Sequence, residues 1–248
     1  MSFEGKLAVV TGAASGIGKQ TAHAFARGGA EIALVDIDQA GAKRVAARIE
    51  ADGGSASVYE ADLSDVGEVR NVFRRLVERH DRIDALANIA AIYPTMPTLE
   101  ITEEHWDRVL DLNLRSVFFA CQEAIKLMLE RGGGAIVNIA SGAAFFPLPG
   151  FAAYSGSKAG LLGATRALAL ETARTDVRIN VVAPGPTETE GTGLRLTEKQ
   201  RQAIANAITP GRWLAPDEIA DAIVYLCSDA ARGIHGAILN VNGGSWMP

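Results

Sequence analysis

The feature that most limits the fold is an apolar run that leads into a glycine-rich turn and then a helical pattern. The run spans residues 7–10, the turn is Thr11-Gly-Ala-Ala-Ser-Gly-Ile-Gly18, and the helical spacing continues to Ala26. This order is typical of a phosphate-binding unit, because glycines let the backbone approach a pyrophosphate and the amides at the helix start hold its charge. The spacing is G-x-x-x-G-x-G rather than the commoner G-x-G-x-x-G, so a plain strand-to-helix connection is the alternative.

Strands and helices are predicted to alternate along the rest of the chain. Alternation of this kind predicts an α/β fold, in which one doubly wound, seven-stranded parallel sheet of the Rossmann type carries helices on both faces. We find no linker or internal repeat, so residues 1–248 are expected to form a single domain. Apolar runs predict further strands at 31–36, 57–63, 83–88, 134–140, 177–183 and within 237–244, and helical spacing predicts helices at 40–51, 66–79, 103–130, 154–173 and 216–226.

Composition excludes several classes of protein. The chain has 48% hydrophobic and 21% charged residues, which is typical of a globular protein, and its net charge of −5 argues against nucleic acid or a membrane as the main partner. The opening residues lack the pattern of a signal peptide, so we expect a cytoplasmic protein. The two cysteines are expected to be free thiols. Four histidines without ligand spacing predict that there is no metal site.

The strand at 31–36 ends in Asp36, a carboxylate close in sequence to the glycine-rich turn. A carboxylate here can accept hydrogen bonds from an adenosine ribose and would repel the additional phosphate of NADP. None of the six residues after Asp36 is Lys or Arg, so the sequence favours NAD. The alternative is that Asp36 only starts the turn before the helix at 40–51.

Four further residues carry groups suited to proton transfer. Tyr154 and Lys158 are four residues apart, on one face of a predicted helix, and a nearby cation favours the phenolate form of a tyrosine. Ser141 follows the strand at 134–140, at the edge where open parallel sheets bind ligands. Asn113 places an amide among apolar residues, where it must find partners. Taken singly, these residues also fit an ordinary helix start, a solvated lysine and a helix-bending asparagine.

Together these motifs resemble the short-chain dehydrogenase/reductase family, and the resemblance covers nearly the whole chain. One departure concerns the family's Asn-Asn-Ala-Gly motif, which is Asn88-Ile-Ala-Ala91 here and predicts weaker local stabilisation of the central sheet. The motifs occur in the family's order and are Thr11-Gly12 with Gly16 and Gly18, Asp62-Leu63, Asn88, Asn113, Ser141, Tyr154 with Lys158, and Pro184-Gly185 with Thr189.

The resemblance implies hydride transfer between a nicotinamide cofactor and a carbonyl or secondary alcohol. It implies that Tyr154 transfers the proton, that Ser141 polarises the substrate oxygen, and that Lys158 lowers the Tyr154 pKa and binds the ribose. It also implies that Asn113 holds a water that links Lys158 to solvent. The cofactor would be bound by Gly12, Ser15, Gly16, Ile17, Gly18, Asp36, Asp62, Leu63, Asn88, Tyr154, Lys158, Pro184, Gly185, Thr187 and Thr189.

The family resemblance also implies a homotetramer, with helices 103–130 and 154–173 as candidate interfaces; the sequence leaves a dimer open. Residues 188–208 are expected to form a substrate lid, where Glu188, Glu190 and Arg195 would be able to reach a polar group.

The segments expected to line the substrate pocket, 92–99 and 142–151, carry no charged side chain. They predict a neutral secondary alcohol or ketone, of the cyclic alcohol, polyol or sugar type. One alternative is a 3-oxoacyl thioester (acyl carrier protein) reductase, which NAD preference disfavours. The other is an NAD(H)-binding sensor or structural protein, which would have no need of a proton relay. The sequence leaves open the substrate's identity and stereochemistry and the direction of the reaction.

Overall fold

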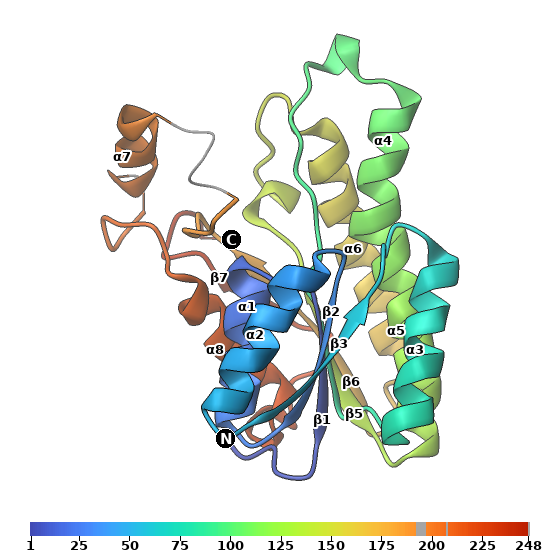
Figure 1. Ribbon diagram of the computed structural model, residues 1–248. Coiled ribbons are helices and arrows are strands. Elements are labelled where there is room, and N and C mark those ends of the chain that lie inside the picture. Colours follow the sequence, from blue (N-terminus) through green and yellow to red (C-terminus); the bar gives the residue numbers. More distant parts are fainter. Residues whose placement is uncertain (192–196, 207, 248) are drawn as a thin grey trace.

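The computed structural model describes residues 1–191, 197–206 and 208–247. Within these ranges, seven strands form one parallel sheet, as predicted, and their order in the sheet is β3-β2-β1-β4-β5-β6-β7 (Figure 1). The strands are β1 (Leu7–Thr11), β2 (Glu31–Asp36), β3 (Ser55–Glu60), β4 (Ala85–Asn88), β5 (Gly134–Ile139), β6 (Val177–Pro184) and β7 (Ile238–Val241). The α-helices are α1 (Gly16–Arg27), α2 (Gln39–Ala51), α3 (Val66–His80), α4 (Glu103–Leu110), α5 (Ser116–Glu130), α6 (Ala152–Glu171), α7 (Glu198–Asn206) and α8 (Pro216–Cys227).

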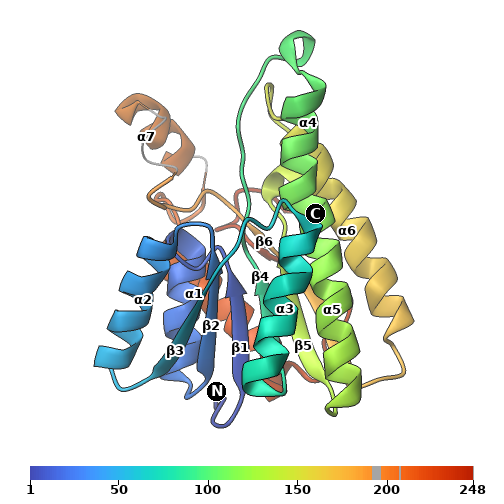
Figure 2. The ribbon, with the colours of Figure 1, turned by 45° about the vertical axis from the view of Figure 1, so that its right-hand side comes forward.

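Helices cover both faces of the sheet: α1, α2 and α8 pack on one, and α3, α5 and α6 on the other (Figures 1 and 2). Successive strand residues point to opposite faces, and this splits β1 between two cores. Ala8 and Val10 join the core beneath α1, whereas Leu7 and Val9 join the core beneath α3 and α5. Burial on both faces explains why β1 is apolar over residues 7–10.

Some predicted boundaries were wrong. The third strand ends at Glu60 rather than continuing to residue 63, because its neighbour β2 ends at Asp36. The last link between the two is a hydrogen bond of 3.2 Å from the Ala61 amide to the Asp36 carbonyl. The helix predicted at 103–130 is interrupted by a π-helical turn, η2 (Asp111–Arg115).

The sheet brings the carboxyl ends of its parallel strands to one edge. The chain runs outward from β1 through β2 to β3, then returns to β4 on the other side of β1. Ligands in open α/β sheets bind at such a reversal of strand order. The carboxyl ends of β1 and β4 therefore mark where a site is expected.

Part of the predicted lid at 188–208 forms helix α7, and Arg195 lies outside the described residues. Among the residues that the structure describes, no helix combines the length and apolar character that crossing a membrane requires. The described part of the chain also holds no cluster of His, Cys, Asp and Glu suited to a metal ion.

Candidate active site

The glycine-rich loop after β1 packs directly against the end of β4. Gly12 has φ +67°, and a Cβ there would lie 2.9 Å from the backbone of Ala90. The Thr11 hydroxyl accepts hydrogen bonds from the amides of Ile89 and Ala90, at 2.9 and 3.1 Å. The loop therefore has room for glycine alone at residue 12, and Thr11 fixes its position at the strand reversal. Thr11 belongs to the glycine-rich motif, but no local pattern in the sequence predicts this role for its hydroxyl.

Helix α1 starts directly after this loop. Gly18 packs so closely that a Cβ there would lie 1.9 Å from the Gly12 carbonyl oxygen. Ser15, the N-cap of α1, is extended, and among the described residues its side chain makes no capping hydrogen bond. Backbone amides at the start of α1, including those of Gly16 and Ile17, are thus held close to β1, in the arrangement that suits a phosphate.

Asp36 is fixed at the mouth of this loop. One of its carboxylate oxygens accepts from the Ala14 amide at 2.8 Å and the other from the Asp38 amide at 2.9 Å. Each oxygen has a second lone pair for a ligand. The predicted juxtaposition of glycine-rich loop and carboxylate is therefore present, and these residues fit the adenosine half of a dinucleotide.

Two other predicted cofactor residues have local structural roles. The Asp62 carboxylate accepts from the amide of Ser64 at 3.0 Å and from its hydroxyl at 2.7 Å. Leu63 is buried in the core beneath α3. Asp62 is thus held in the turn that follows β3, at the same edge of the sheet as Asp36.

The side chain of Asn88 is buried within the sheet. Its amide donates to Asn138 on β5 at 2.9 Å and to the Cys121 sulfur at 3.4 Å, and Asn138 donates in turn to Thr165 at 3.0 Å. Burial raises the pKa of Cys121 to about 12, so this thiol is protonated at neutral pH. The network joins β4 to β5 and α6, and Thr11 holds the backbone at Ile89, so the predicted weakness of this region is offset.

Ser141, Tyr154 and Lys158 lie together at the carboxyl end of β5. The Ser141 hydroxyl accepts from the Ala143 amide at 3.1 Å and interacts with the Tyr154 side chain, whose pKa it lowers. Lys158 is 1% exposed, and its ammonium donates to the Ile139 carbonyl at 2.7 Å and lies 6.0 Å from the centre of the Tyr154 ring. Helix α6 presents the tyrosine and the lysine on one face, as their spacing predicts.

Burial perturbs the acid-base properties of this pair. It raises the pKa of Tyr154, and the hydrogen bond with Ser141 opposes that effect. It also lowers the pKa of Lys158 to about 7. The expectation that Lys158 lowers the Tyr154 pKa is therefore not met in this arrangement, because loss of hydration outweighs the attraction of an ammonium that donates its hydrogen bond elsewhere.

Asn113 lies in the π-helical turn and is fully buried. Its amide oxygen accepts from the Ile92 amide at 2.9 Å, and its nitrogen donates to the Ile92 carbonyl at 2.7 Å and to the Ser157 hydroxyl at 3.3 Å. Ser157 donates to the Tyr154 carbonyl at 2.7 Å. Asn113 thus connects the loop after β4 to the helix that carries Tyr154, a contact that the sequence did not predict.

Aromatic side chains surround the Ser141–Tyr154 pair. Tyr93 and Phe151 contact the Tyr154 ring, with centroids 6.1 and 5.9 Å away. Phe145 packs on Trp246, with centroids 4.6 Å apart, and the Trp246 nitrogen lies 3.0 Å from where a Gly142 Cβ would be. These aromatic neighbours are uncharged, and Tyr93, Phe145 and Phe151 belong to the segments 92–99 and 142–151 that were expected to line the substrate pocket. Trp246 was missed because it follows the last strand and no local motif marks it.

The segment after β6 lies over the glycine-rich loop. A Cβ on Gly185 would lie 2.7 Å from the backbone of Asn242, and the Thr187 hydroxyl donates to the Gly185 carbonyl at 2.9 Å. The Thr189 side chain lies 3.1 Å from where a Gly16 Cβ would be. The motif that begins at Pro184 thus reaches α1, so Thr189 lies beside the loop that it was predicted to share with a cofactor.

The acidic residues of the predicted lid contact other parts of the chain. The Glu190 carboxylate accepts from the Gly16 amide at 2.9 Å and pairs with Lys19. Glu188 pairs with Arg201 on α7. Glu190 therefore lies on the predicted cofactor loop rather than in the substrate pocket.

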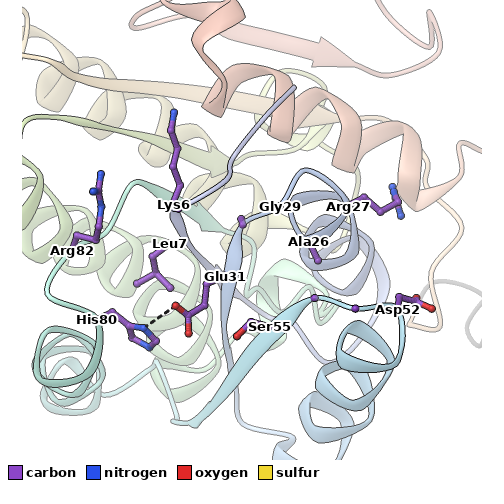
Figure 3. Close-up of a pocket in the computed structure, with 14 residues that line it drawn as sticks. Lys6, Leu7, Ala26, Arg27, Gly29, Glu31, Asp52, Ser55, His80 and Arg82 are labelled. Carbon is purple, nitrogen blue, oxygen red and sulfur yellow. Dashed lines mark ion pairs between the residues drawn. The ribbon is translucent and has the colours of Figure 1, made fainter.

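A separate cavity of about 590 Å³ lies at the opposite, amino-terminal edge of the sheet (Figure 3). Its charged side chains are largely paired: His80 with Glu31 at 3.4 Å, and Lys6 with Asp229 at 3.3 Å. Strand polarity puts the substrate site of such folds at the other edge. We therefore assign the candidate active site to the carboxyl edge.

Comparison with known proteins identifies the family. A family model described as enoyl-(acyl carrier protein) reductase matches residues 12–245. The chain belongs to the short-chain dehydrogenase/reductase family. It is 41% identical to D-threitol dehydrogenase of Mycolicibacterium smegmatis over 242 residues, covering 98% of this chain and 93% of that protein. It is 36% identical to a 3-oxoacyl-(acyl carrier protein) reductase of Thermotoga maritima, covering 98% and 99%.

A solved structure agrees with the fold. A Beutenbergia cavernae protein, described as an NAD(P)-dependent gluconate 5-dehydrogenase with NADP bound at low occupancy, superposes with a TM-score of 0.93 at 39% identity, covering 98% of each chain. As a member of this family the chain is an oxidoreductase that acts on CH–OH groups.

Proposed function

We propose that this oxidoreductase uses NAD to oxidise a neutral secondary alcohol of the polyol or sugar type, or reduces the matching ketone. The observation that supports this most is the grouping of Ser141, Tyr154 and buried Lys158 at the sheet edge that carries the glycine-rich loop. The proposed unit is one dehydrogenase domain over residues 1–248, with 188–208 as its substrate lid.

The proposed roles follow from the position of each group. When bound, the nicotinamide would supply the hydride acceptor or donor. Ser141 would donate a hydrogen bond to the substrate oxygen, and Tyr154 would accept the alcohol proton. Lys158 lies beside the Tyr154 ring and would stabilise the phenolate that accepts this proton, and a pKa near 7 lets it exchange protons at neutral pH. Asn113 would hold the loop at Ile92 and helix α6 in register, and lie on the proton path to solvent.

The dinucleotide would bind along the carboxyl edge of the sheet. The glycine-rich loop and the start of α1 fit the pyrophosphate, and Lys158 fits the nicotinamide ribose. Asn88 would contribute through its backbone, because its side-chain amide is held by Asn138. The full set proposed for the cofactor is Gly12, Ser15, Gly16, Ile17, Gly18, Asp36, Asp62, Leu63, Asn88, Tyr154, Lys158, Pro184, Gly185, Thr187 and Thr189.

Asp36 supports NAD as the cofactor. A 2′-phosphate on the adenosine ribose would meet its carboxylate, which two backbone amides hold in place. No Lys or Arg follows within six residues to compensate that charge.

The uncharged aromatic surroundings of Tyr154 support a neutral substrate, and the similarity to D-threitol dehydrogenase supports a polyol. A second candidate, 3-oxoacyl thioester reduction, is favoured by the similarity to the Thermotoga maritima reductase. We rank it lower, because Asp36 disfavours the NADPH on which biosynthetic reduction usually draws.

We also propose a cytoplasmic homotetramer. Large apolar side chains are exposed on the helices predicted as interfaces: Trp106 on α4 is 39% exposed, Phe118 on α5 36% and Leu170 on α6 79%. Faces of this kind mark interaction surfaces. Light scattering on the purified protein would give the mass of the assembly, and a monomer would contradict this proposal.

The deciding experiment measures the formation of NADH from NAD, or of NADPH from NADP, with a panel of tetritols, hexitols and cyclic alcohols. Reduction of 3-oxoacyl thioesters by NADPH is measured alongside. We expect turnover of polyols with NAD. Reduction of the thioester alone would favour the second candidate. Binding of NADH without turnover on either panel would favour a sensor.

A further inference from the structure

Helix α1 differs from its neighbours in how its N-terminus is satisfied. Helices α2, α3 and α4 each begin with a side chain that accepts from a first-turn amide, supplied by Asp38, Asp65 and Thr102. Helix α1 has no acidic residue in its first turn, and within the described ranges its N-cap Ser15 makes no such bond. The positive end of its dipole must therefore be stabilised by an anion from another part of the chain or from a ligand.

The anion found there comes from a residue far along the chain. The Glu190 carboxylate accepts from the Gly16 amide at 2.9 Å with one oxygen and pairs with Lys19 through the other. The hydrogen bond from Lys19 holds the pKa of Glu190 below its ordinary value, so the group is charged at neutral pH. A backbone amide at a helix start and an ammonium are the donors that a phosphate group also seeks.

We propose that Glu190 is an internal competitor for the dinucleotide: its carboxylate occupies the pyrophosphate position at Gly16 and Lys19, and it must leave that position when the cofactor binds. This inference rests on the proposed function, because it requires the glycine-rich loop to bind a dinucleotide. Two anions repel each other at a single set of donors. The bound Glu190 carboxylate therefore lowers the apparent affinity of this loop for a pyrophosphate. Glu190 thus sets cofactor affinity without touching the nicotinamide or the substrate.

The test compares cofactor fragments on the wild type, Glu190→Gln and Glu188→Gln. Glutamine keeps the size and removes the charge, and Glu188, which pairs with Arg201, is the matched control in the same segment. Calorimetry would measure the dissociation constants of NADH, ADP-ribose and inorganic pyrophosphate, with adenosine as a ligand that lacks phosphate.

We expect Glu190→Gln to bind NADH, ADP-ribose and pyrophosphate about fivefold more tightly, which corresponds to about 1 kcal/mol for a charge at a helix terminus. Adenosine should bind equally to all three proteins, and Glu188→Gln should match the wild type. If the wild type binds ADP-ribose and Glu190→Gln binds it equally or more weakly, this inference is wrong and the proposed function stands. A wild type that binds neither NADH nor ADP-ribose would overturn the proposed function and this inference with it.

Discussion

The two edges of the sheet differ in how their polar groups are satisfied. At the amino edge, acidic side chains lie beside basic ones, as Glu31 does beside His80 (Figure 3) and Asp229 beside Lys6. At the carboxyl edge, Lys158 is buried without a carboxylate partner among the described residues, and α1 takes its anion from a distant loop. Unfavourable burial of this kind is typical of sites that bind and react. We infer that the side chains at the amino edge stabilise the fold, whereas those at the carboxyl edge bind the cofactor and take part in the reaction.

The largest expected effect is on Tyr154. Replacing it by phenylalanine removes the hydroxyl that would carry the proton and keeps the ring against Tyr93 and Phe151. We expect kcat to fall about 10³-fold, in the range found for general acid-base groups. Steady-state kinetics with the best alcohol would measure this, and unchanged NADH binding would show that the site is intact. A loss of less than tenfold would mean that another group transfers the proton.

Next is the effect of Lys158 on stability. Its folded pKa of about 7 lies below the ordinary value of 10.5, so between these values the unfolded chain binds more protons than the folded one. Stability must then rise with pH across that window, by about 1.4 kcal/mol per pH unit, and this contribution is lost as the pH falls toward 7.

Urea unfolding of the cofactor-free wild type and Lys158→Met at about pH 7, 8 and 9 would measure this effect. The wild type should gain stability relative to the variant as the pH rises. Subtracting the two profiles removes the contribution of the buried thiols, whose pKa values are raised to about 12. Parallel profiles would mean that Lys158 is not desolvated in solution.

A smaller effect is expected at Asp36. Asp36→Ala removes the carboxylate that would meet a 2′-phosphate, and we expect the ratio of kcat/KM for NAD over NADP to fall about tenfold, near 1.4 kcal/mol. Asp38→Ala is the matched control, since that residue caps α2. An unchanged ratio would remove Asp36 as the source of cofactor selectivity.

The smallest effect is expected at the amino edge. Glu31→Gln weakens the pair with His80 and leaves the fold's cavity in place. We expect kcat/KM within about twofold of the wild type, because this pair lies at the edge of the sheet opposite the candidate active site. A tenfold loss of kcat/KM would show that the two edges are coupled. It would contradict the inference that the amino edge has a structural role only.

The sequence predicted the sheet, the order of its elements and the positions of the main groups because these depend on local patterns. Glycine spacing placed the loop after β1, and the i, i+4 spacing placed Tyr154 beside Lys158. Contacts between distant segments left no such pattern. The pairing of Glu190 with Gly16, the packing of Trp246 on Phe145, and the partners of Asn113 each join segments that only the folded sheet brings together.

The sequence also did not predict the direction in which the Tyr154 pKa is shifted. Spacing shows that a cation is near, whereas the shift depends on how much water each group loses on folding. Burial dominates at both Tyr154 and Lys158, and burial is a property of the assembled core.

The π-helical turn η2 has a consequence for how this site could change over time. A π turn holds one residue more than the α-helical turn it replaces, so it is equivalent to an insertion that the rest of the helix absorbs. Deleting one codon within 111–115 would restore a regular helix and leave α4 and α5 on their present faces. The fold would survive such a deletion, but the amide of Asn113 would lose its place opposite Ile92.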